Sequence, residues 1–255
     1  MSIDPSDPRP PSRQIADNLR RAIREGELAP DDRLPSEREL VATYGTASQT
    51  TRQAVALLKA EGLVEGRAGR GVFVRKQPPM MRMGSERYAR HRRTKGVAPF
   101  QAEVEAMGLN WRQEVLELAT VPAPDWVAEW FALKPRTKLF VRRRRMWIEN
   151  IPTQLADSYY RLEDVKDTRI MQEDTGPGGG FARLEDKGLK LERFREEIAI
   201  RMPTPDEARG LRLGPGIPIA ELHRITFTLN RAVEVFRSIL AGHSHVFAYE
   251  FPAPE

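Results

Sequence analysis

The chain has 255 residues, 40% of them hydrophobic, with a net charge of +5 and a sequence pI near 9.6. It has no cysteine, which excludes disulfides and thiolate metal sites and favours a reducing compartment. No apolar run approaches the length of a membrane span, and residues 1–11 lack the apolar core of a signal peptide. We therefore expect a cytoplasmic protein with two domains.

The first expected helix follows a Pro- and Asp-bearing stretch. Residues 1–11 are expected to be a disordered tail. Ser12 is the expected helix cap, because Ile15, Leu19 and Ile23 then recur on one helical face. This helix should pack against the two that come next.

Two further helix starts come in quick succession. Ser36 can cap the first, Glu39 can complete a capping box, and Gly45 ends the helix. Thr46 then offers a capping hydroxyl for the second, with Gln49 three residues later. Two short helices joined by such a turn are typical of a helix-turn-helix, whose second helix enters the major groove of DNA.

A small hairpin with a basic tip follows the two helices. The β-prone runs 63–65 and 72–74 flank a tip of Gly and Arg, which predicts a wing. The alternative is a winged helix that binds only protein, but two helix caps and a Gly-Arg wing favour DNA. The excess of Lys and Arg also lies in the first hundred residues. The residues expected to bind DNA are Ser36, Glu37, Arg38, Ser48, Gln49, Thr50, Thr51, Arg52, Arg67, Gly69, Arg70 and Gly71.

This N-terminal part resembles the GntR-type bacterial transcription regulators. The match includes Asp32-Arg33-Leu34-Pro35-Ser36-Glu37-Arg38-Glu39-Leu40, Glu61-Gly62-Leu63-Val64 and Gly69-Arg70-Gly71-Val72-Phe73-Val74. Family members usually carry Val-Ser-Arg where this chain has Thr46-Ala47-Ser48. Losing that arginine removes a bidentate donor, so the usual operator sequence of the family is not expected here.

A basic stretch separates the two expected domains. Residues 12–76 form the expected DNA-binding domain, and 77–99 hold Pro78-Pro79 and a basic run from Arg87 to Lys95. We expect a solvated interdomain linker. Its charges could also reach flanking phosphates or lie against the next domain.

From residue 100 onward, helices and strands are interspersed. The Gly-rich stretch 176–180 lacks the lysine of a phosphate loop and is expected to be a flexible loop beside a pocket. The pattern predicts an α+β fold with a mainly antiparallel sheet. Helices are expected at 100–107, 124–131 and 205–211, and strands at 115–121, 138–148, 153–160, 194–202, 219–229, 233–241 and 246–251.

Several short motifs here resemble the effector-binding UTRA domain of HutC-type GntR regulators, over residues 100–252. They include Val121-Pro122-Ala123-Pro124, Ile151-Pro152 and Ala232-Val233-Glu234-Val235. The resemblance implies an antiparallel-sheet domain like the chorismate lyase fold, with a ligand cavity. It also implies a homodimer that responds to a small-molecule effector.

A run of four arginines lies on one of the expected strands. Alternation along a strand turns Arg142 and Arg144 to one face and Arg143 and Arg145 to the other. For any single arginine, a basic sheet surface paired with carboxylates is the simpler interpretation. The resemblance nevertheless implies that Arg144 binds an anionic effector.

The resemblance also bears on what the effector is. Where sugar-phosphate-binding relatives carry polar residues, this chain has Met146, Ala156, Gly179 and Phe181. We therefore expect a larger, more apolar effector with at most one anionic group, such as an aromatic acid. The residues expected around it are Arg144, Met146, Tyr159, Phe181, Glu197 and Arg237.

The predicted function is a ligand-responsive transcriptional repressor that binds a palindromic operator as a homodimer. No cofactor, membrane partner or catalytic residue is expected. His243 and His245 have no acidic or thiol ligand nearby, so no metal site is expected either. The alternatives are a lyase-like small-molecule enzyme, which has no nucleophile-base pair to support it, and a ligand-independent autoregulator.

Overall fold

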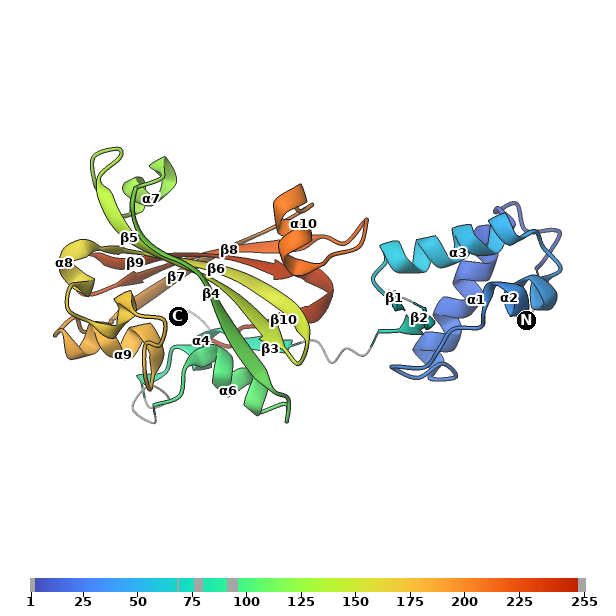
Figure 1. Ribbon diagram of the computed structural model, residues 1–255, viewed down its shortest axis with the longest axis horizontal. Helices are drawn as coiled ribbons and strands as arrows, with labels where there is room; N and C mark the ends of the chain where they lie inside the picture. The colour runs from blue at the N-terminus through green and yellow to red at the C-terminus, as the bar shows by residue number, and fades with distance from the viewer. Residues whose placement is uncertain (1–2, 68, 76–79, 91–95, 252–255) are drawn as a thin grey trace. The chain divides into compact units, whose positions relative to one another are not determined.

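The computed structural model describes residues 3–67, 69–75, 80–90 and 96–251, which fall into two compact units (Figure 1). The first unit comprises Met1–Pro78 with Leu213–Ile217. The second comprises Pro79–Arg212 with Pro218–Glu255. Each unit has a hydrophobic core of its own.

The first unit contains three helices followed by a two-stranded hairpin, so the predicted winged helix-turn-helix is confirmed. The two strands pair antiparallel. Apolar side chains of all three helices and the hairpin, among them Ile15, Leu40, Leu58 and Val64, form its core. The elements are α1 (Pro11–Glu25), α2 (Glu37–Tyr44), α3 (Ser48–Ala60), β1 (Val64–Arg67) and β2 (Gly71–Val74).

Helix α2 begins and ends where its local signals predict. The Glu39 amide donates to Ser36 Oγ at 3.3 Å, and the Ser36 amide donates to Glu39 Oε2 at 2.7 Å. This reciprocal pair satisfies two amides that the helix itself leaves without acceptors. At the other end Gly45 has φ +61°, the left-handed conformation that glycine adopts without strain.

Helix α3 begins without the predicted cap. Ala47 occupies the cap position, and no side chain bonds to the first amides of the helix. The expectation for Thr46 is therefore wrong, since Thr46 lies one residue too early in the chain. Its hydroxyl is buried with no hydrogen-bond partner among the described residues.

The second unit is built on a six-stranded sheet. Every neighbouring pair of strands is antiparallel, in the order β4-β5-β6-β9-β8-β7, which confirms the predicted α+β fold. A turn at Glu149-Asn150 joins β5 to β6. The strands are β4 (Trp111–Pro122), β5 (Lys138–Ile148), β6 (Ile151–Arg161), β7 (Arg193–Arg201), β8 (Ile219–Phe227) and β9 (Ala232–Ala241).

Short helices lie on both faces of this sheet. Figure 1 shows α6 on one face and α7 and α10 on the other. The three predicted helices are confirmed, whereas α9 begins inside the glycine-rich stretch that was expected to be a loop. The bounds are α6 (Pro99–Glu105), α7 (Asp125–Trp130), α8 (Leu162–Val165), α9 (Gly179–Asp186) and α10 (Pro205–Leu211), with 3-10 turns η1 (Arg169–Met171) and η2 (Gly242–Ser244).

The expected linker is in large part folded into the second unit. It contains β3 (Met80–Met83) and α4 (Gly84–Arg87), and β3 pairs in parallel with β10 (His245–Ala248). Strand β10 therefore does not extend the main sheet. Arg82 is fully buried because Glu196 supplies a carboxylate inside the unit, so it is not a solvated linker charge. The basic positions 91–95 lie outside the described residues.

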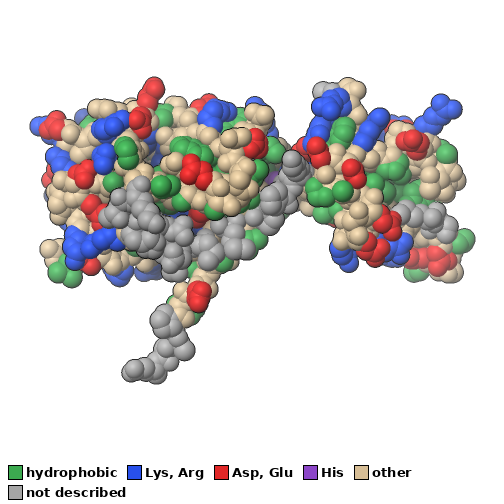
Figure 2. Space-filling model, turned by 90° about the horizontal axis from the view of Figure 1, so that it is seen from below, with side chains coloured by type: hydrophobic (Ala, Val, Ile, Leu, Met, Phe, Trp, Pro, Cys, Tyr) green, Lys and Arg blue, Asp and Glu red, His purple; other side chains and the backbone are tan. Residues whose placement is uncertain are grey.

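Charges of both signs cover the surface of the second unit. Figure 2 shows Lys and Arg side chains interspersed with Asp and Glu side chains on its visible face. Surface ion pairs of this unit include Arg195 with Glu197 and Lys190 with Glu192. Exposed pairs of this kind add little to stability.

Candidate functional sites

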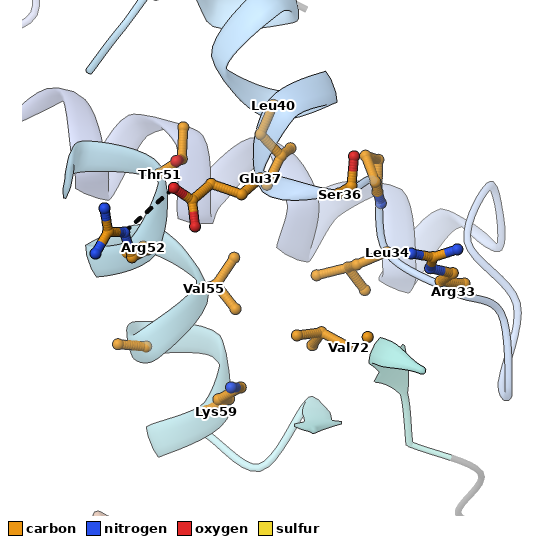
Figure 3. A pocket seen from close by; sticks show the side chains of 13 residues that line it. Arg33, Leu34, Ser36, Glu37, Leu40, Thr51, Arg52, Val55, Lys59 and Val72 are labelled. Carbon is orange, nitrogen blue, oxygen red and sulfur yellow. Dashed lines mark ion pairs between the residues drawn. The ribbon is translucent and has the colours of Figure 1, made fainter. Parts of the chain in front are cut away.

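A groove of about 440 Å³ opens in the first unit between the start of α2, the exposed side of α3 and strand β2 (Figure 3). Arg52, Val55 and Lys59 follow one another along α3 on this side. Glu37, at the start of α2, points toward Arg52, and the lining also includes Ser36, Arg33, Leu34 and Val72.

The groove carries more positive than negative charge. Three of its side chains, Arg33, Arg52 and Lys59, are cationic, and only Glu37 is anionic. Arg52 Nε lies 3.3 Å from Glu37 Oε1, and both side chains are largely exposed, at 62% and 47%. An exposed pair is weak, so Arg52 can exchange Glu37 for a phosphate or a base. Glu37 is therefore placed to hold Arg52 rather than to meet phosphates.

The sequence interpretation missed Arg33 and Lys59. The signal for Lys59 was present, because a residue seven positions after Arg52 returns to the same helical face. Arg33 lies four residues before the first residue of α2, outside the capping residues Ser36 and Glu39. Both cations widen the surface that could follow a phosphate backbone.

Most of the expected recognition residues lie at the surface of α3. Gln49 and Arg52 are exposed, and Ser48 and Thr50 are half-buried. Thr51 is a correction, because it is fully buried and its hydroxyl donates to the Ser48 carbonyl at 2.9 Å. The helical period places it on the inner face with Ala54 and Leu58, so it cannot reach a base.

The two arginines of the wing, Arg67 and Arg70, differ in exposure and in their contacts. Gly69 has φ +69° and nothing within 4 Å of the place where a side chain would begin, so its backbone is open to a close approach. Arg70 beside it is exposed. Arg67 instead pairs with Asp31 and Glu65 and lies over the Phe73 ring at 4.4 Å, which corrects its expected role as a wing donor. Residue 68 is outside the described residues.

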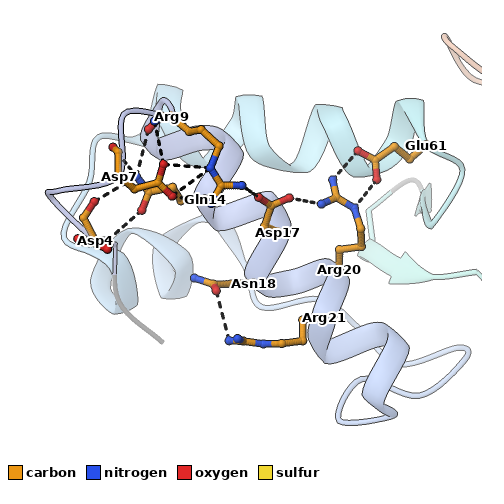
Figure 4. Close-up of polar contacts among 9 residues, drawn as sticks. All are labelled: Asp4, Asp7, Arg9, Gln14, Asp17, Asn18, Arg20, Arg21 and Glu61. Atoms are coloured by element: carbon orange, nitrogen blue, oxygen red, sulfur yellow. Dashed lines mark hydrogen bonds and ion pairs between the residues drawn. The ribbon is translucent and has the colours of Figure 1, made fainter.

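Helix α1 supports α3 through polar contacts (Figure 4). Arg20 donates to both oxygens of Glu61, just after α3, at 2.8 and 2.6 Å.

At the other end of α1, the Asp4 amide donates to Gln14 Oε1 at 2.9 Å, and Gln14 Nε2 donates to the Arg9 carbonyl at 3.1 Å. Residues 3–10 are therefore ordered against α1 rather than forming the expected disordered tail.

The start of α1 differs from its prediction as well. Pro10 occupies the cap position and Pro11 opens the helix, which suits a residue that has no amide hydrogen to satisfy. Ser12 is therefore a buried residue of the first turn and not the cap.

A cavity of about 110 Å³, here called the inner cavity, lies against one face of the main sheet in the second unit. Its lining comes from β4, β5, β6, β8, β9, α4, α6 and α9. The structure brings together here the positions that the family resemblance associated with the effector. They are Arg144, Met146, Ala156, Gly179 and Phe181.

Three other expected effector residues lie elsewhere. Tyr159 packs edge-on against Trp126, with ring centroids 5.9 Å apart, because its neighbour Tyr160 takes the cavity side of β6. Arg237 donates to Glu221 at 2.6 Å and to Glu207 at 2.9 Å on the face away from the cavity. Glu197 is exposed and pairs with Arg195. All three expectations are wrong, since strand alternation turns these side chains away.

Arg144 differs from Arg87 and Arg224, the other arginines of the inner cavity, because it forms no ion pair among the described residues. It donates to Ser158 Oγ at 2.6 Å, and its Nε has no hydrogen-bond partner among the described residues. No ion pair of Arg144 occurs in the described part of the chain. Burial lowers the pKa of Arg144, although it remains a cation at neutral pH. A buried cation without a carboxylate partner is suited to an anion.

The other charges of the inner cavity are paired. Arg224 donates to Glu234 Oε2 at 2.6 Å, and Tyr160 donates to Glu234 Oε1 at 2.8 Å. Burial disfavours the charged form of Arg224, but Glu234 outweighs it and raises the Arg224 pKa. Arg87 pairs with Glu103 at the side of the cavity. The sequence interpretation missed these residues. Tyr160, Arg224 and Glu234 lie on strands whose side chains alternate between the two faces of the sheet, and they share the face of Arg144. Strand alternation combined with the pairing register could have identified them.

Two of the remaining three arginines, Arg143 and Arg145, follow the simpler interpretation of pairing with carboxylates, whereas Arg142 is buried and donates to backbone carbonyls. Arg142 shares the Arg144 face and donates to the Glu173 carbonyl at 2.6 Å, and burial lowers its pKa to about 10. Arg143 pairs with Glu117 and Arg145 with Glu114, on the opposite face. The predicted alternation is confirmed.

The histidine pair shows no metal-binding geometry. His245 is buried, with Nδ1 3.0 Å from the Ala241 carbonyl. Within the described ranges, no group of three His, Cys, Asp or Glu side chains could hold a metal ion. No described helix is long and apolar enough to cross a membrane.

Comparisons with known proteins cover both units. The family model described as bacterial regulatory proteins, gntR family, matches residues 11–74, and the UTRA domain model matches residues 106–245. An uncharacterized HTH-type transcriptional regulator of Streptomyces coelicolor is 34% identical over 253 residues, which cover 96% of this chain and 94% of the relative.

Two further relatives match over nearly their full length. The HTH-type transcriptional repressor NagR of Bacillus subtilis is 25% identical over 251 residues and covers 98% of both chains. A crystal structure of a GntR-family transcriptional regulator is 26% identical, with a TM-score of 0.61, and covers 96% of this chain and 99% of that one. The relatives named here are transcriptional regulators.

Proposed function

The chain belongs to the GntR family of bacterial regulatory proteins and carries a UTRA domain, and we propose on this basis that it is a HutC-type, ligand-responsive transcriptional repressor. The family membership implies DNA binding by the first unit and effector binding by the second. Repression is the proposed sign of regulation because NagR, similar over the whole chain, is a repressor. The protein would act in the cytoplasm, where bacterial DNA lies.

For DNA, we propose that α3 enters the major groove and that Gly69 and Arg70 of the wing approach the neighbouring backbone. The cationic groove supports this assignment, since Arg33, Arg52 and Lys59 can follow phosphates. A homodimer would place two such units on a palindromic operator. The proposed contact residues are Ser36, Arg38, Ser48, Gln49, Thr50, Arg52, Gly69, Arg70 and Gly71, with Arg33 and Lys59 added.

For the effector, the observation that carries the proposal is the unpaired cation in the inner cavity. Glu103 pairs with Arg87 and Glu234 with Arg224, which leaves the charge of Arg144 uncompensated among the described residues. One anionic group would balance it, whereas a dianionic phosphate would not be matched. Met146 and Phe181 give the same cavity an apolar wall. The proposed effector is therefore a small molecule with a single anionic group.

The experiment selects fragments of the host genome with the purified full-length chain and footprints the bound sites. We expect an inverted repeat, protection on both half-sites and binding that weakens steeply with salt. Sites without two-fold symmetry, or binding insensitive to salt, would contradict the proposed mode. Genes next to the selected sites would then supply candidate anionic metabolites.

A further inference from the structure

The inner cavity is too small to enclose a whole effector. Its volume is about 110 Å³, whereas pockets that enclose small-molecule ligands span roughly 300–1,000 Å³. It can take an anionic group and a few more atoms. The rest of the molecule must extend beyond it.

A second hollow, here called the outer chamber, adjoins the inner cavity. It has about 370 Å³ and is lined by Trp111, Gln113, Val115, Glu173 and Asp174. Gln113 lines both spaces. The three β4 residues alternate along the strand and pair with Ile148, Met146 and Arg144 of β5, so they share the cavity face of the sheet.

The two spaces have opposite charge. The inner cavity holds the uncompensated Arg144, whereas the outer chamber offers two carboxylates, Glu173 and Asp174. Asp174 accepts from the Gly176 amide at 2.8 Å, which lowers its pKa, and pairs with Arg169. Glu173 has an exposed side chain, and its backbone is fixed because its carbonyl accepts from Arg142.

An aromatic surface joins these carboxylates to the inner cavity. Trp111 is 37% exposed, and its indole nitrogen donates to Glu105 at 3.3 Å. Its ring meets the Phe100 ring edge-on, with centroids 6.5 Å apart, and Phe100 lines the inner cavity. A carboxylate beside an indole face is a recurrent environment for an organic cation.

A buried amide also points to a ligand. Gln154 lines the inner cavity with only 3% of its surface exposed. Its Oε1 atom has no hydrogen-bond partner in the described part of the chain. A buried acceptor of this kind costs free energy until a donor reaches it.

We propose that the effector is dipolar, with an anionic group on Arg144 and a cationic group in the outer chamber beside Glu173, Asp174 and Trp111. Its apolar middle lies between Met146 and Phe100. This inference rests on the proposed function, since it assigns the chemical class of ligand to the same cavity. It adds a second recognition point that the monoanion proposal does not need.

The test is calorimetric titration of the full-length chain with two probe series. One is the ω-amino acids from aminobutanoate to aminooctanoate, and the other is the unsubstituted carboxylates of the same lengths. We expect at least one ω-amino acid to bind about fivefold tighter than its unsubstituted counterpart, the gain of one partly exposed charge pair. Glu173→Gln should abolish this advantage, and Glu163→Gln, an exposed carboxylate elsewhere, should keep it.

The outcomes separate the two proposals. Equal affinity for the two series, or no binding of any ω-amino acid, overturns the dipolar effector. An advantage that survives Glu173→Gln overturns it as well. The anion site itself is tested by the unsubstituted carboxylates, because their binding should be lost in Arg144→Gln whether or not the outer chamber takes a cation.

Discussion

The two units of this protein use arginine in opposite ways. In the first unit Arg38, Arg52 and Arg70 are exposed, and the pair between Arg52 and Glu37 is open to solvent. In the second unit Arg82 and Arg224 are buried and held by carboxylates. The difference shows that composition alone does not reveal which arginines meet a partner molecule. Their role depends on whether the chain itself supplies the opposite charge.

Arg144 is the exception in the second unit, and it is the residue proposed to bind the effector. It lies among buried arginines, yet it has no carboxylate partner among the described residues. In this respect it resembles Arg38 and Arg70 of the first unit, which are exposed and form no ion pair among the described residues. The proposed DNA surface and the inner cavity therefore each contain a cation that has no ion-pair partner among the described residues.

The largest expected effect breaks a buried pair. Arg224→Met leaves Glu234 buried without its cation and should lower the free energy of unfolding of the second unit by about 3–5 kcal/mol. Arg70→Met in the wing should change unfolding by no more than about 0.5 kcal/mol. Denaturant unfolding of both variants measures the contrast. Similar stabilities would show that the buried pair is not structural.

The next effect concerns pH. An unfolded histidine titrates near 6.5, and burial lowers the pKa of His245 to about 4. Between these values the unfolded chain binds the proton more readily, so stability should fall as pH drops from 6.5 toward 4, by about 3 kcal/mol at most. His245→Asn should flatten this part of the profile. An unchanged slope in thermal unfolding across that window would contradict the assignment.

A smaller effect is expected at the DNA surface. Arg52→Ala should weaken operator binding by roughly 1–3 kcal/mol if Arg52 leaves Glu37 for DNA, and should leave unfolding unchanged. Arg24→Ala, an exposed arginine of α1, is the matched control and should bind as the wild type does. Fluorescence anisotropy with the selected operator measures both. Equal affinity of the two variants would remove Arg52 from the interface.

The smallest effect tests the local signal that starts α2. Ser36→Ala removes the hydroxyl that accepts from the Glu39 amide and should cost about 1 kcal/mol of unfolding free energy in the first unit. Ser6→Ala, in the N-terminal segment, serves as a surface control. If both variants unfold alike, the capping box adds nothing to the helix.

Sequence signals sufficed where a structure depends on neighbouring residues. The Ser36–Glu39 capping box and the alternation of Arg142 to Arg145 each depend on residues only a few positions apart in the chain. Both are predicted correctly. The cavity positions Arg144 and Phe181 came from family resemblance, because nothing local links β5 to α9.

The failures arise where partners are distant in the chain. Arg82 was assigned to a linker because its carboxylate, Glu196, lies 114 residues later. Tyr159 and Arg237 are expected in the pocket but lie on the other face of the sheet. Which of a strand's side chains turn toward the pocket depends on the register with the neighbouring strands, and no local sequence pattern gives that register. The expectation that Thr51 contacts DNA is wrong for a simpler reason. The helical period already places Thr51 on the inner face of α3 with Ala54 and Leu58.

The central claim is that an anion on Arg144 controls DNA binding by the other unit. The direct measurement is operator affinity of the full-length wild type and Arg144→Gln, each with and without the carboxylate probe that binds the wild type most tightly. We predict equal operator affinity of the two proteins without ligand, and a ligand-induced loss of affinity in the wild type alone. An Arg144→Gln protein that responds to the carboxylate as the wild type does would contradict the account.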